Sequence, residues 1–462
     1  MSRKKIYILS SIAIIFVAAI LWGCIYLFAP KSYEDLIPAQ AKMVVRLQPS
    51  ESNAQDLKNI IDAVGISTEG VDASQPLYAF ITPNEYIGFV AKVADENAIK
   101  KAFNGLVVQK KCQSIEISDG QNWVWINSGW LVTWTSRYLL AIGPGLASER
   151  DVLRQTAISL ANSGDCFKDS PSFKRLRDEK GFMQIFALMD ALPTPYNMIF
   201  RQNIPSSCDP SAVEIYASAE KSKGGKTLIN SHIESENQDI LACIDQYEKS
   251  KKHLDVMNQT AVDSALFYMA TSFQGKDLLD ILKTDATLRG LLLGINQTID
   301  ADKIMGSTNG VFSIELGGFN KDWTPTFCVK GESPLYNLFA DADYWMESAK
   351  KQHHVTLKRI SSNDYFLSNE KEQVKFGQNV QQGIYYFATP SMESRISAPI
   401  FMQGSNTKKG PIIYLSINLR HLFQQPSMQE GAISTILKTL LPGSNRLTYK
   451  SFVGRKGQMI IE

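Results

Sequence analysis

The sequence predicts an α+β protein with mainly antiparallel sheets and flanking helices, preceded by an N-terminal transmembrane helix. Short apolar runs rich in Val, Ile, Phe and Tyr are more frequent than helix-like patterns along the 462 residues. The helical patterns stand between groups of strands and do not alternate with them, which disfavours a doubly wound parallel sheet. Turn signals such as Thr82-Pro83-Asn84-Glu85 join consecutive strands into hairpins.

The first element is an uncharged apolar run from Ile6 to Ala29. At about 1.5 Å per helical residue the run covers roughly 36 Å, which exceeds the hydrocarbon core of about 30 Å. Arg3, Lys4 and Lys5 precede it, so the positive-inside rule places the N-terminus in the cytoplasm. The sequence therefore predicts a single-pass inner-membrane protein that contacts the lipid bilayer through Ile6–Ala29 and has its bulk in the periplasm.

This run has two other interpretations. A cleaved signal peptide is disfavoured, because its apolar region is typically about 7–15 residues long and no A-x-A site follows here. The run also contains the Gly23-Cys24 pair that lipid attachment requires, so a lipoprotein attached at Cys24 is the alternative. Trp22 fits such a motif poorly, and Ile25–Phe28 continues the apolar run, so the uncleaved anchor is favoured.

Two copies of one α+β module are expected after the anchor. The predicted parts are a cytoplasmic stub and transmembrane anchor at 1–30, a tether at 31–40, a first module at 41–257 and a second module at 258–462. A polar helix over 238–258 marks the boundary between the modules, since its charged stretch is typical of a solvated face.

The first copy opens with an apolar strand from Lys42 to Leu47. A helix around Gln55–Val64 follows, where apolar residues recur at i, i+3, i+4 and i+7. Two strands, Leu77–Ile81 and Tyr86–Val93, then lead to a helix at Glu96–Phe103 with Asp95 as its cap.

The second copy repeats this order at a nearly constant offset in the sequence. Its strand Ala265–Ala270, helix Lys276–Lys283, strands Val311–Leu316 and Thr326–Lys330, and helix Leu335–Ala349 follow one another as in the first copy. Identity between the copies is low, but the shared order favours duplication over chance.

The charge balance excludes a polyanion binder that works by bulk attraction, so no nucleic acid partner is expected. The chain has 48 Lys and Arg against 46 Asp and Glu, a net charge of +2. Without the cytoplasmic Arg3, Lys4 and Lys5, 45 basic and 46 acidic residues remain, which gives −1. Five His and six Cys are too few for a metal array or a dense disulfide scaffold.

No motif predicts a catalytic residue, a cofactor or a metal site. The sequence has no G-x-S-x-G nucleophile elbow. His353-His354 is the only His pair, and neighbours on a strand point to opposite faces. Two D-x-D spacings, Asp300/Asp302 and Asp341/Asp343, have the form of a divalent-ion site, but a helix start and an exposed helix face explain them better.

Four of the seven tryptophans, Trp123, Trp125, Trp130 and Trp134, lie within twelve residues. Strand periodicity puts Trp123 and Trp125 on one face, and Trp130 and Trp134 on one face, so the two pairs can stack across a hairpin. If exposed, they form an aromatic platform for sugar rings or a partner chain. The alternative is dense core packing, which the residue types favour.

Five cysteines follow the anchor, namely Cys112, Cys166, Cys208, Cys243 and Cys328. The first four lie in the first module and permit three disulfide connectivities, between which the sequence does not choose. Cys328 stands alone in a strand and is expected to be buried and free.

The segment from Leu36 to Leu47 resembles the start of uncharacterised envelope proteins of Bacteroidetes-type bacteria, which open with an I-P-x-x-A-x-x-V-V-x-hydrophobic strand. The segment from Asp169 to Leu176 is similar to the mid-domain helix of that family. The resemblance covers most of the chain and implies an envelope location. Members are often lipoproteins, and the apolar run after Cys24 departs from that pattern. The family carries no assigned chemistry and supplies no site residues.

We therefore expect a membrane-anchored periplasmic binding or scaffold protein of the bacterial envelope, with an envelope protein or a glycan as its partner. The alternative is a hydrolase-like enzyme that acts on an envelope polymer, with a site assembled from residues distant in the sequence. An enzyme should show a concave pocket with convergent polar groups, and a binding module an exposed apolar or aromatic face.

Overall fold

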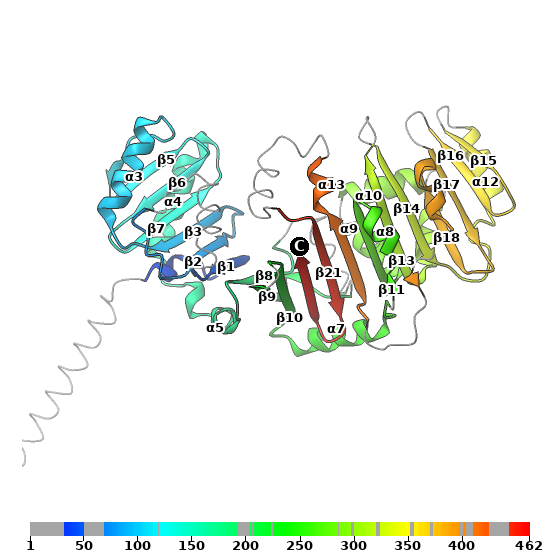
Figure 1. Ribbon diagram of the computed structural model, residues 1–462, viewed down its shortest axis with the longest axis horizontal. Coiled ribbons are helices and arrows are strands. Elements are labelled where there is room, and N and C mark those ends of the chain that lie inside the picture. Colours follow the sequence, from blue (N-terminus) through cyan, green and yellow to red (C-terminus); the bar gives the residue numbers. More distant parts are fainter. Residues whose placement is uncertain are drawn as a thin grey trace, which may run out of the picture. The chain divides into compact units, whose positions relative to one another are not determined.

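The computed structural model describes residues 32–49, 69–118, 120–191, 204–205, 207–222, 225–254, 256–257, 259–284, 286–296, 300–319, 324–351, 355–369, 373–397, 401–402, 410–424 and 443–462. The chain forms two compact units (Figure 1). Unit 1 comprises Met1–Ala41 and Glu69–Phe173, and unit 2 comprises Lys42–Thr68 and Lys174–Glu462.

This division differs from the predicted modules at 41–257 and 258–462. Strand β10 (Thr227–Glu234) of the first predicted module pairs with strand β22 (Lys456–Ile461) of the second, so both contribute to one sheet of unit 2. The compact units follow from contacts within the fold, whereas the predicted modules follow from a repeated order of elements in the sequence. The modules therefore stay a prediction.

The predicted membrane span Ile6–Ala29, the alternative attachment site Cys24 and the predicted helix around Gln55–Val64 all lie outside the described residues. Among the helices of the described residues, none combines the length and apolar character that a membrane crossing needs.

Six strands in the described part of unit 1 form one antiparallel sheet in the order β2-β3-β7-β6-β5-β4. The strands are β2 (Leu77–Ile81), β3 (Ile87–Lys92), β4 (Glu116–Ser118), β5 (Gln121–Ile126), β6 (Trp130–Trp134) and β7 (Tyr138–Gly143). The helical elements are η1 (Tyr33–Leu36), α3 (Glu96–Val108), η2 (Ala147–Glu149), α4 (Arg150–Asn162) and η3 (Phe167–Asp169), with α5 (Pro171–Asp178) at the end of the unit.

Helices cover both faces of this sheet, so every residue of β6 and β7 is buried. Helix α3 directs Ile99 and Phe103 into the interior, and α4 directs Leu153, Ala157 and Leu160. The predicted cap of α3 is confirmed, because the Asp95 side chain accepts hydrogen bonds from the first-turn backbone amides.

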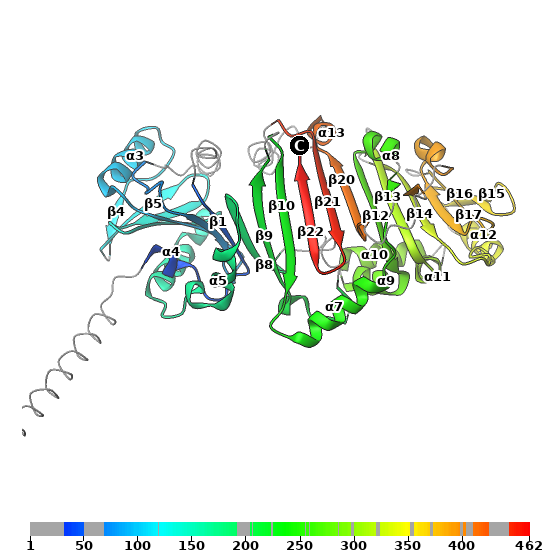
Figure 2. The same ribbon diagram turned by 60° about the horizontal axis from the view of Figure 1, so that its bottom comes forward.

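Unit 2 contains a long antiparallel sheet, which Figure 2 shows face on. In the described residues its order is β1-β8-β9-β10-β22-β21-β20-β12-β13-β14-β18-β17-β16-β15. Its other strands are β1 (Met43–Leu47), β8 (Met183–Leu188), β9 (Glu214–Lys221), β12 (Phe267–Gln274), β13 (Asn309–Phe319), β14 (Pro325–Glu332), β15 (Thr356–Arg359), β16 (Asp364–Ser368), β17 (Gln373–Asn379), β18 (Ile384–Ala388), β20 (Ile413–Asn418) and β21 (Arg446–Phe452). Strands β11 (Val256–Met257) and β19 (Phe401–Met402) pair separately.

The helical elements of unit 2 lie between groups of strands, as the sequence predicts. They are η4 (Pro210–Ala212), α7 (Gln238–Ser250), α8 (Gln259–Ser264), α9 (Gly275–Thr284), α10 (Ala286–Asn296), α11 (Ala301–Gly306), α12 (Ala342–Lys350), η5 (Pro390–Arg395) and α13 (Leu419–Gln424). The predicted α+β class with mainly antiparallel strands is therefore confirmed.

One order of strand pairing occurs twice along the chain. The order β2-β3-β7-β6-β5-β4 in unit 1 matches β13-β14-β18-β17-β16-β15 in unit 2, strand for strand in sequence order. The order β1-β8-β9-β10 likewise matches β12-β20-β21-β22.

Helix α12 begins at Ala342, so the prediction of a helix from Leu335 is wrong for its first part. The reason is the buried side chain of Gln378 on β17. Its amide oxygen accepts from the Leu338 backbone N–H at 2.8 Å, and its amide nitrogen donates to the carbonyl oxygens of Pro334 and Tyr336. These bonds hold the segment in a non-helical turn.

Candidate functional site

The four clustered tryptophans are all buried. Trp123, Trp125, Trp130 and Trp134 are exposed by 1%, 5%, 6% and 0%. They offer no aromatic platform to a ligand, so that interpretation is corrected in favour of core packing. The physical reason is the helix on each face of the sheet, which removes both faces of the hairpin from solvent.

The two tryptophan pairs also point to opposite faces and do not stack across the hairpin. Trp123 lies opposite Thr133, and Trp134 lies opposite Asn122. Opposite residues share a face of the sheet and consecutive residues do not, so the two tryptophan pairs lie on opposite faces. Trp134 stacks on Phe103 of α3, with 5.0 Å between ring centroids. On the other face, the guanidinium of Arg154 on α4 lies 4.9 Å from the Trp123 ring centroid.

The turn between β5 and β6 determines this register. Gly129 has a φ of +91°, a left-handed conformation that glycine adopts without strain. The resulting turn sets Ile126 opposite Trp130, and every later pair in the hairpin follows from that closing pair.

A groove of about 720 Å³ lies on unit 1, on the α4 side. Its walls come from residues 38–40 after η1, the turn between β2 and β3, one side of α4 and the residues that follow α4. Its lining comprises Pro38, Ala39, Gln40, Thr82, Pro83, Asn84, Asp151, Val152, Gln155, Thr156, Ser159, Leu160, Ser163 and Asp165. The volume falls within the range of small-ligand sites, roughly 300–1,000 Å³.

The groove lining is rich in hydroxyl and amide groups and contains no Lys or Arg. Asn84, Gln155 and Ser159 are exposed there and carry neutral hydrogen-bonding groups. Val152, at 51% exposure, and Pro83 add apolar surface. The two carboxylates, Asp151 and Asp165, give the groove a negative charge that disfavours anionic ligands.

Sequence reasoning missed this groove, although α4 carries a signal for it. Val152, Thr156, Ser159 and Ser163 follow one another at helical spacing on one side of the helix. An exposed helix face normally carries charged residues, whereas this face has short neutral ones. The groove itself arises only when the Thr82–Asn84 turn and residues 38–40 come beside that face.

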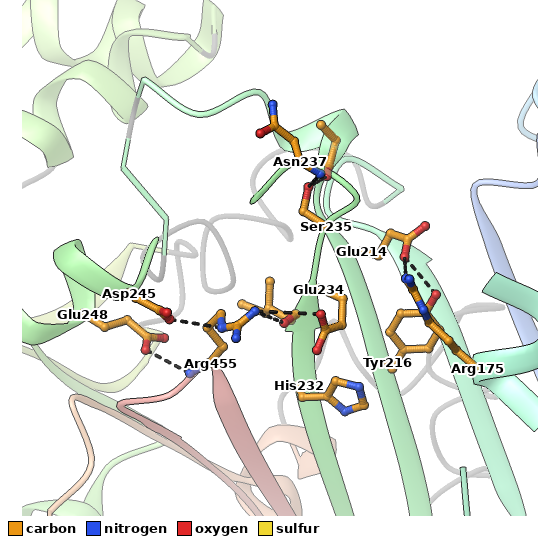
Figure 3. A network of polar contacts seen from close by, with 12 residues as sticks. Arg175, Glu214, Tyr216, His232, Glu234, Ser235, Asn237, Asp245, Glu248 and Arg455 are labelled. Carbon is orange, nitrogen blue, oxygen red and sulfur yellow. Dashed lines mark hydrogen bonds and ion pairs between the residues drawn. The ribbon is translucent and has the colours of Figure 1, made fainter. Parts of the chain in front are cut away.

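A second cluster of polar side chains lies in unit 2 around Arg455 (Figure 3). The Arg455 guanidinium lies 3.1 Å from Asp245 and 3.8 Å from Glu234. The backbone amides of Gly454 and Arg455 both donate to one oxygen of the buried Glu248 carboxyl, at 2.8 and 2.9 Å. These contacts join the β21–β22 hairpin to α7.

The remaining groups in Figure 3 also bind one another. Glu214 accepts from the Tyr216 hydroxyl at 2.8 Å and pairs with Arg175 at 3.1 Å. His232 stacks on the Tyr216 ring and lies 3.8 Å from Glu179. Because the charged groups of this network pair with one another across the β21–β22 hairpin, β10 and α7, we assign the network to stability and the groove to ligand binding.

Two buried ionisable groups lie together near the end of α7. Burial raises the pKa of Glu248, and its contacts with the Arg455 and Gly454 amides oppose that rise. Burial also lowers the pKa of Lys251 to about 7, against the attraction of Glu248 and Asp277. The Lys251 ammonium lies 4.7 Å from the Tyr247 ring centroid.

Another buried charged group lies between β13, β14 and η5. Glu315 and Arg395 form an ion pair at 3.2 Å that lacks hydrogen-bond geometry, and burial raises the pKa of Glu315. Lys330 donates to the Arg395 carbonyl oxygen at 2.9 Å, and burial lowers its pKa.

The D-x-D spacings have structural roles. Asp300 caps α11 by accepting from the Lys303 backbone N–H, and Asp302 pairs with Lys283. Asp341 pairs with Lys303 at 2.6 Å, and Asp343 pairs with Arg359 at 2.8 Å. The described residues contain no set of three His, Cys, Asp or Glu arranged around a metal position.

Two further predictions concern a His pair and a lone Cys. His353-His354 lies outside the described residues. Cys328 is buried and free, as predicted.

Comparison with known proteins identifies a family and little more. The family described as Domain of unknown function (DUF4836) matches residues 38–434. Three solved structures of TP0453, crystal forms IV, I and III, match at a TM-score of 0.30 each and identities of 14%, 13% and 14%. They cover 43%, 48% and 49% of this chain and 79%, 87% and 90% of that chain. No curated protein matches. At these TM-scores the likeness carries no inference about this chain.

Proposed function

The chain belongs to the family described as Domain of unknown function (DUF4836), and we propose that it is a membrane-anchored, extracytoplasmic binding protein of the bacterial envelope. Its ligand is a glycan, held in the groove of unit 1. The observation that carries this ligand class is the groove lining, which combines hydroxyl and amide side chains with two carboxylates and no Lys or Arg.

The proposed location depends on the N-terminal sequence. The uncharged run Ile6–Ala29 is long enough to span a bilayer, and Arg3, Lys4 and Lys5 before it favour a cytoplasmic N-terminus. With this orientation the chain that follows Ala29 is extracytoplasmic, where envelope glycans are. Lipid attachment at Cys24 is the alternative anchor and leads to the same side of the membrane.

Chemical complementarity supports the glycan. Sugar hydroxyls both donate and accept hydrogen bonds, as the side chains of Gln155, Ser159 and Asn84 do. Carboxylates such as Asp151 accept hydrogen bonds from sugar hydroxyls. The C–H faces of a sugar ring find apolar surface on Val152 and Pro83.

One observation favours the alternative, an enzyme that hydrolyses an envelope polymer. Asp151 and Asp165 line the same groove, and glycoside hydrolases use a pair of carboxyl groups. The general acid of such an enzyme sits in a desolvating pocket, whereas both of these side chains are exposed. We therefore propose binding in preference to hydrolysis.

We also propose that the two predicted modules arose by duplication. The repeated order of strand pairing supports this proposal, since nine or more elements follow the same sequence in both halves. In chain order, the helix α4 that lines the groove corresponds to the six-residue η5 in the described residues of the other copy.

A pair of matched glutamine variants tests the groove. Gln155 lies in the groove, and Gln109 is an exposed glutamine at the end of α3 in the same unit. The full chain, purified in detergent, is incubated with isolated peptidoglycan sacculi and with soluble amino-sugar oligosaccharides, and bound protein is measured. We expect Q155K to weaken binding at least tenfold, because a long charged side chain fills the groove, and Q109K to bind as the wild type does.

Different results separate the alternatives. Equal binding by Q155K and the wild type would exclude the groove as the glycan site. Release of new reducing ends, abolished by D151N or D165N, would establish the enzyme instead. Failure of the wild type to bind either probe, together with crosslinking of a protein at the groove, would replace the glycan with a protein partner.

A further inference from the structure

Cys208 and Cys243 lie in one apolar cluster of unit 2, although 35 positions separate them in the sequence. Cys208 precedes η4, and Cys243 lies on α7. Met189, Ile204, Val213, Ile233 and Ile244 complete the buried part of this cluster. Cys208 is buried, and Cys243 is partly exposed.

The two thiols are neighbours, since both side chains pack in this one cluster and interact with each other. The other described cysteines have different surroundings. The Cys112 thiol donates to the Phe103 carbonyl oxygen, Cys166 contacts the Asp169 carboxylate, and Cys328 packs against Ala388 and Met392. The sequence leaves open which of Cys112, Cys166, Cys208 and Cys243 pair. Among them, the structure brings Cys208 and Cys243 together.

Both cysteines are on ordered backbone. The Cys208 amide donates to the Pro205 carbonyl oxygen, and Asp209 caps η4 by accepting from the Ser211 amide. Helix α7 is capped at its start by Asn237, whose side chain accepts from two backbone amides. A disulfide bond is about 2.05 Å long, so thiols already in contact need side-chain rotation and only a small backbone shift to form one.

We propose that Cys208 and Cys243 are an oxidisable pair that closes to a disulfide, linking the segment before β9 to helix α7. The oxidant is a disulfide compound, either a small one such as glutathione disulfide or that of a thiol–disulfide oxidoreductase. The pair is distant in the chain from the groove residues, and this inference does not depend on glycan binding.

The reaction proceeds by two thiol–disulfide exchanges. Cys243, the more exposed thiol, loses its proton and attacks one sulfur of the oxidant's disulfide, which releases one thiolate and leaves a mixed disulfide. Cys208 then loses its proton and attacks the Cys243 sulfur, so the Cys208–Cys243 bond forms and the second thiolate leaves. The protein loses two electrons and two protons, and the oxidant becomes two thiols.

The surroundings of Cys208 predict which step is slow. In the reduced protein burial, with a smaller contribution from Cys243, raises the pKa of Cys208 to about 11, and burial still acts on Cys208 when Cys243 is in the mixed disulfide. Only the thiolate attacks, so closure should accelerate about tenfold per pH unit below that pKa.

The full chain in detergent is reduced, freed of reductant and treated with glutathione disulfide at pH 8.5. Non-reducing tryptic mass spectrometry should then find peptides Gln202–Lys221 and Thr227–Lys249 joined, with the loss of two hydrogens. The oxidised protein should melt about 5 °C or more above the reduced one, because the bond closes a loop of about 36 residues.

Single variants separate the two steps. C208S should retain one glutathione on Cys243, because nothing displaces it, and C243S should remain unmodified at the buried Cys208. The control C328S should form the bond as the wild type does. Wild-type protein that keeps both thiols free after this treatment, or that joins either cysteine to Cys112 or Cys166, would overturn the proposal. Because the main readout uses wild-type protein, it does not depend on the folding of a variant.

Discussion

The six-stranded sheet of unit 1 and the β13–β18 section of unit 2 have the same order of strand pairing but different interiors. Among the described residues, the buried charged side chains are Glu248, Lys251, Glu315 and Lys330, all in unit 2. The buried polar side chains of unit 1 are uncharged: Thr82, Asn122, Thr133 and Ser172.

Glu315 and Lys330 lie on β13 and β14 of the β13–β18 section, whereas Glu248 and Lys251 lie at the end of α7. The elements that cover the two sheets account for the buried charges of β13 and β14. In unit 1 the 13-residue helices α3 and α4 supply apolar side chains over both faces. In unit 2 the six-residue η5 covers part of one face, and its Arg395 supplies a guanidinium to Glu315 and a carbonyl oxygen to Lys330. The same order of strand pairing is therefore compatible with an uncharged interior and with an interior that contains charged side chains, provided that each buried charge has a partner.

The largest expected effects on stability come from substitutions in the aromatic cores of the unit 1 sheet and of the β13–β18 section. Trp134 on β6 and Phe376 on β17 are both 0% exposed and stack on other rings. We expect W134A and F376A each to reduce the free energy of unfolding by about 3–5 kcal/mol, measured by chemical denaturation.

Hydrogen exchange locates each loss. Protection should fall in the sheet of unit 1 for W134A and in β13–β18 for F376A. The variant W134F should cost less than W134A, because it keeps an aromatic ring in the core. The buried indole N–H that both variants remove has no hydrogen-bond partner. Equal loss of protection in both regions for either alanine variant would contradict independent cores.

The buried ion pair of unit 2 should give the next largest effect. R395M leaves the Glu315 carboxyl buried without its guanidinium, which should lower the free energy of unfolding by about 2–3 kcal/mol. The double variant E315Q/R395M should recover part of that loss, because an uncharged side chain then replaces the unpaired carboxylate. If the double variant is as unstable as the sum of the single variants E315Q and R395M, the pair is not coupled.

The pH dependence of stability should distinguish a buried lysine of unit 2 from a paired lysine of unit 1. Lys251 has a pKa of about 7 in the folded protein, against about 10.4 in an unfolded chain. Between these values the unfolded chain binds more protons, so stability rises with pH. The wild type should gain about 1 kcal/mol per pH unit relative to K251M between about pH 7.5 and 9.5.

The matched control is K168M in unit 1. Partial burial opposes a rise in the pKa of Lys168, but its contact with Asp35 outweighs that effect, so its pKa is raised. The stabilisation from Lys168 is then fully present below the unfolded pKa and is lost only above it. The wild type and K168M should therefore keep a constant difference in the free energy of unfolding in the same pH window. A constant difference between the wild type and K251M over that window would exclude a neutral buried Lys251.

The smallest effects concern an arginine that lies over an aromatic ring in each region. Arg154 lies 4.9 Å from the Trp123 centroid and pairs with Glu116, while Arg359 lies 5.6 Å from the Tyr365 centroid and pairs with Asp343. R154A should cost about 0.5–1 kcal/mol in thermal or chemical denaturation. R359A should cost less, because Arg359 is more exposed and Tyr is the weaker ring; the reverse order would show that the ring contacts do not matter.

Local sequence signals predicted many elements of the fold correctly. The alternating and apolar runs predicted strands β2, β3, β13 and β14, and Asp95 marked the start of α3. The start of α12 was missed, because Gln378, which lies on a strand later in the chain, holds residues 334–338 in a turn.

The candidate site could not be predicted because its parts come from separate segments. The turn Thr82–Asn84, residues 38–40 and helix α4 meet only in the folded unit, so the groove has no contiguous motif. The tryptophans gave a strong compositional signal, but composition does not report whether a helix covers the face on which a side chain lies.

The sequence by itself determined the α+β class, the hairpins, the uncharged apolar run Ile6–Ala29 and the set of cysteines, because each depends on neighbouring residues or on simple counts. Only the tertiary structure decided which cysteines meet, which charges are buried and where a ligand can bind. Those features depend on contacts between segments that are distant in the sequence. A different hairpin register or a covering helix of different length would change these contacts and leave the pattern of strands the same.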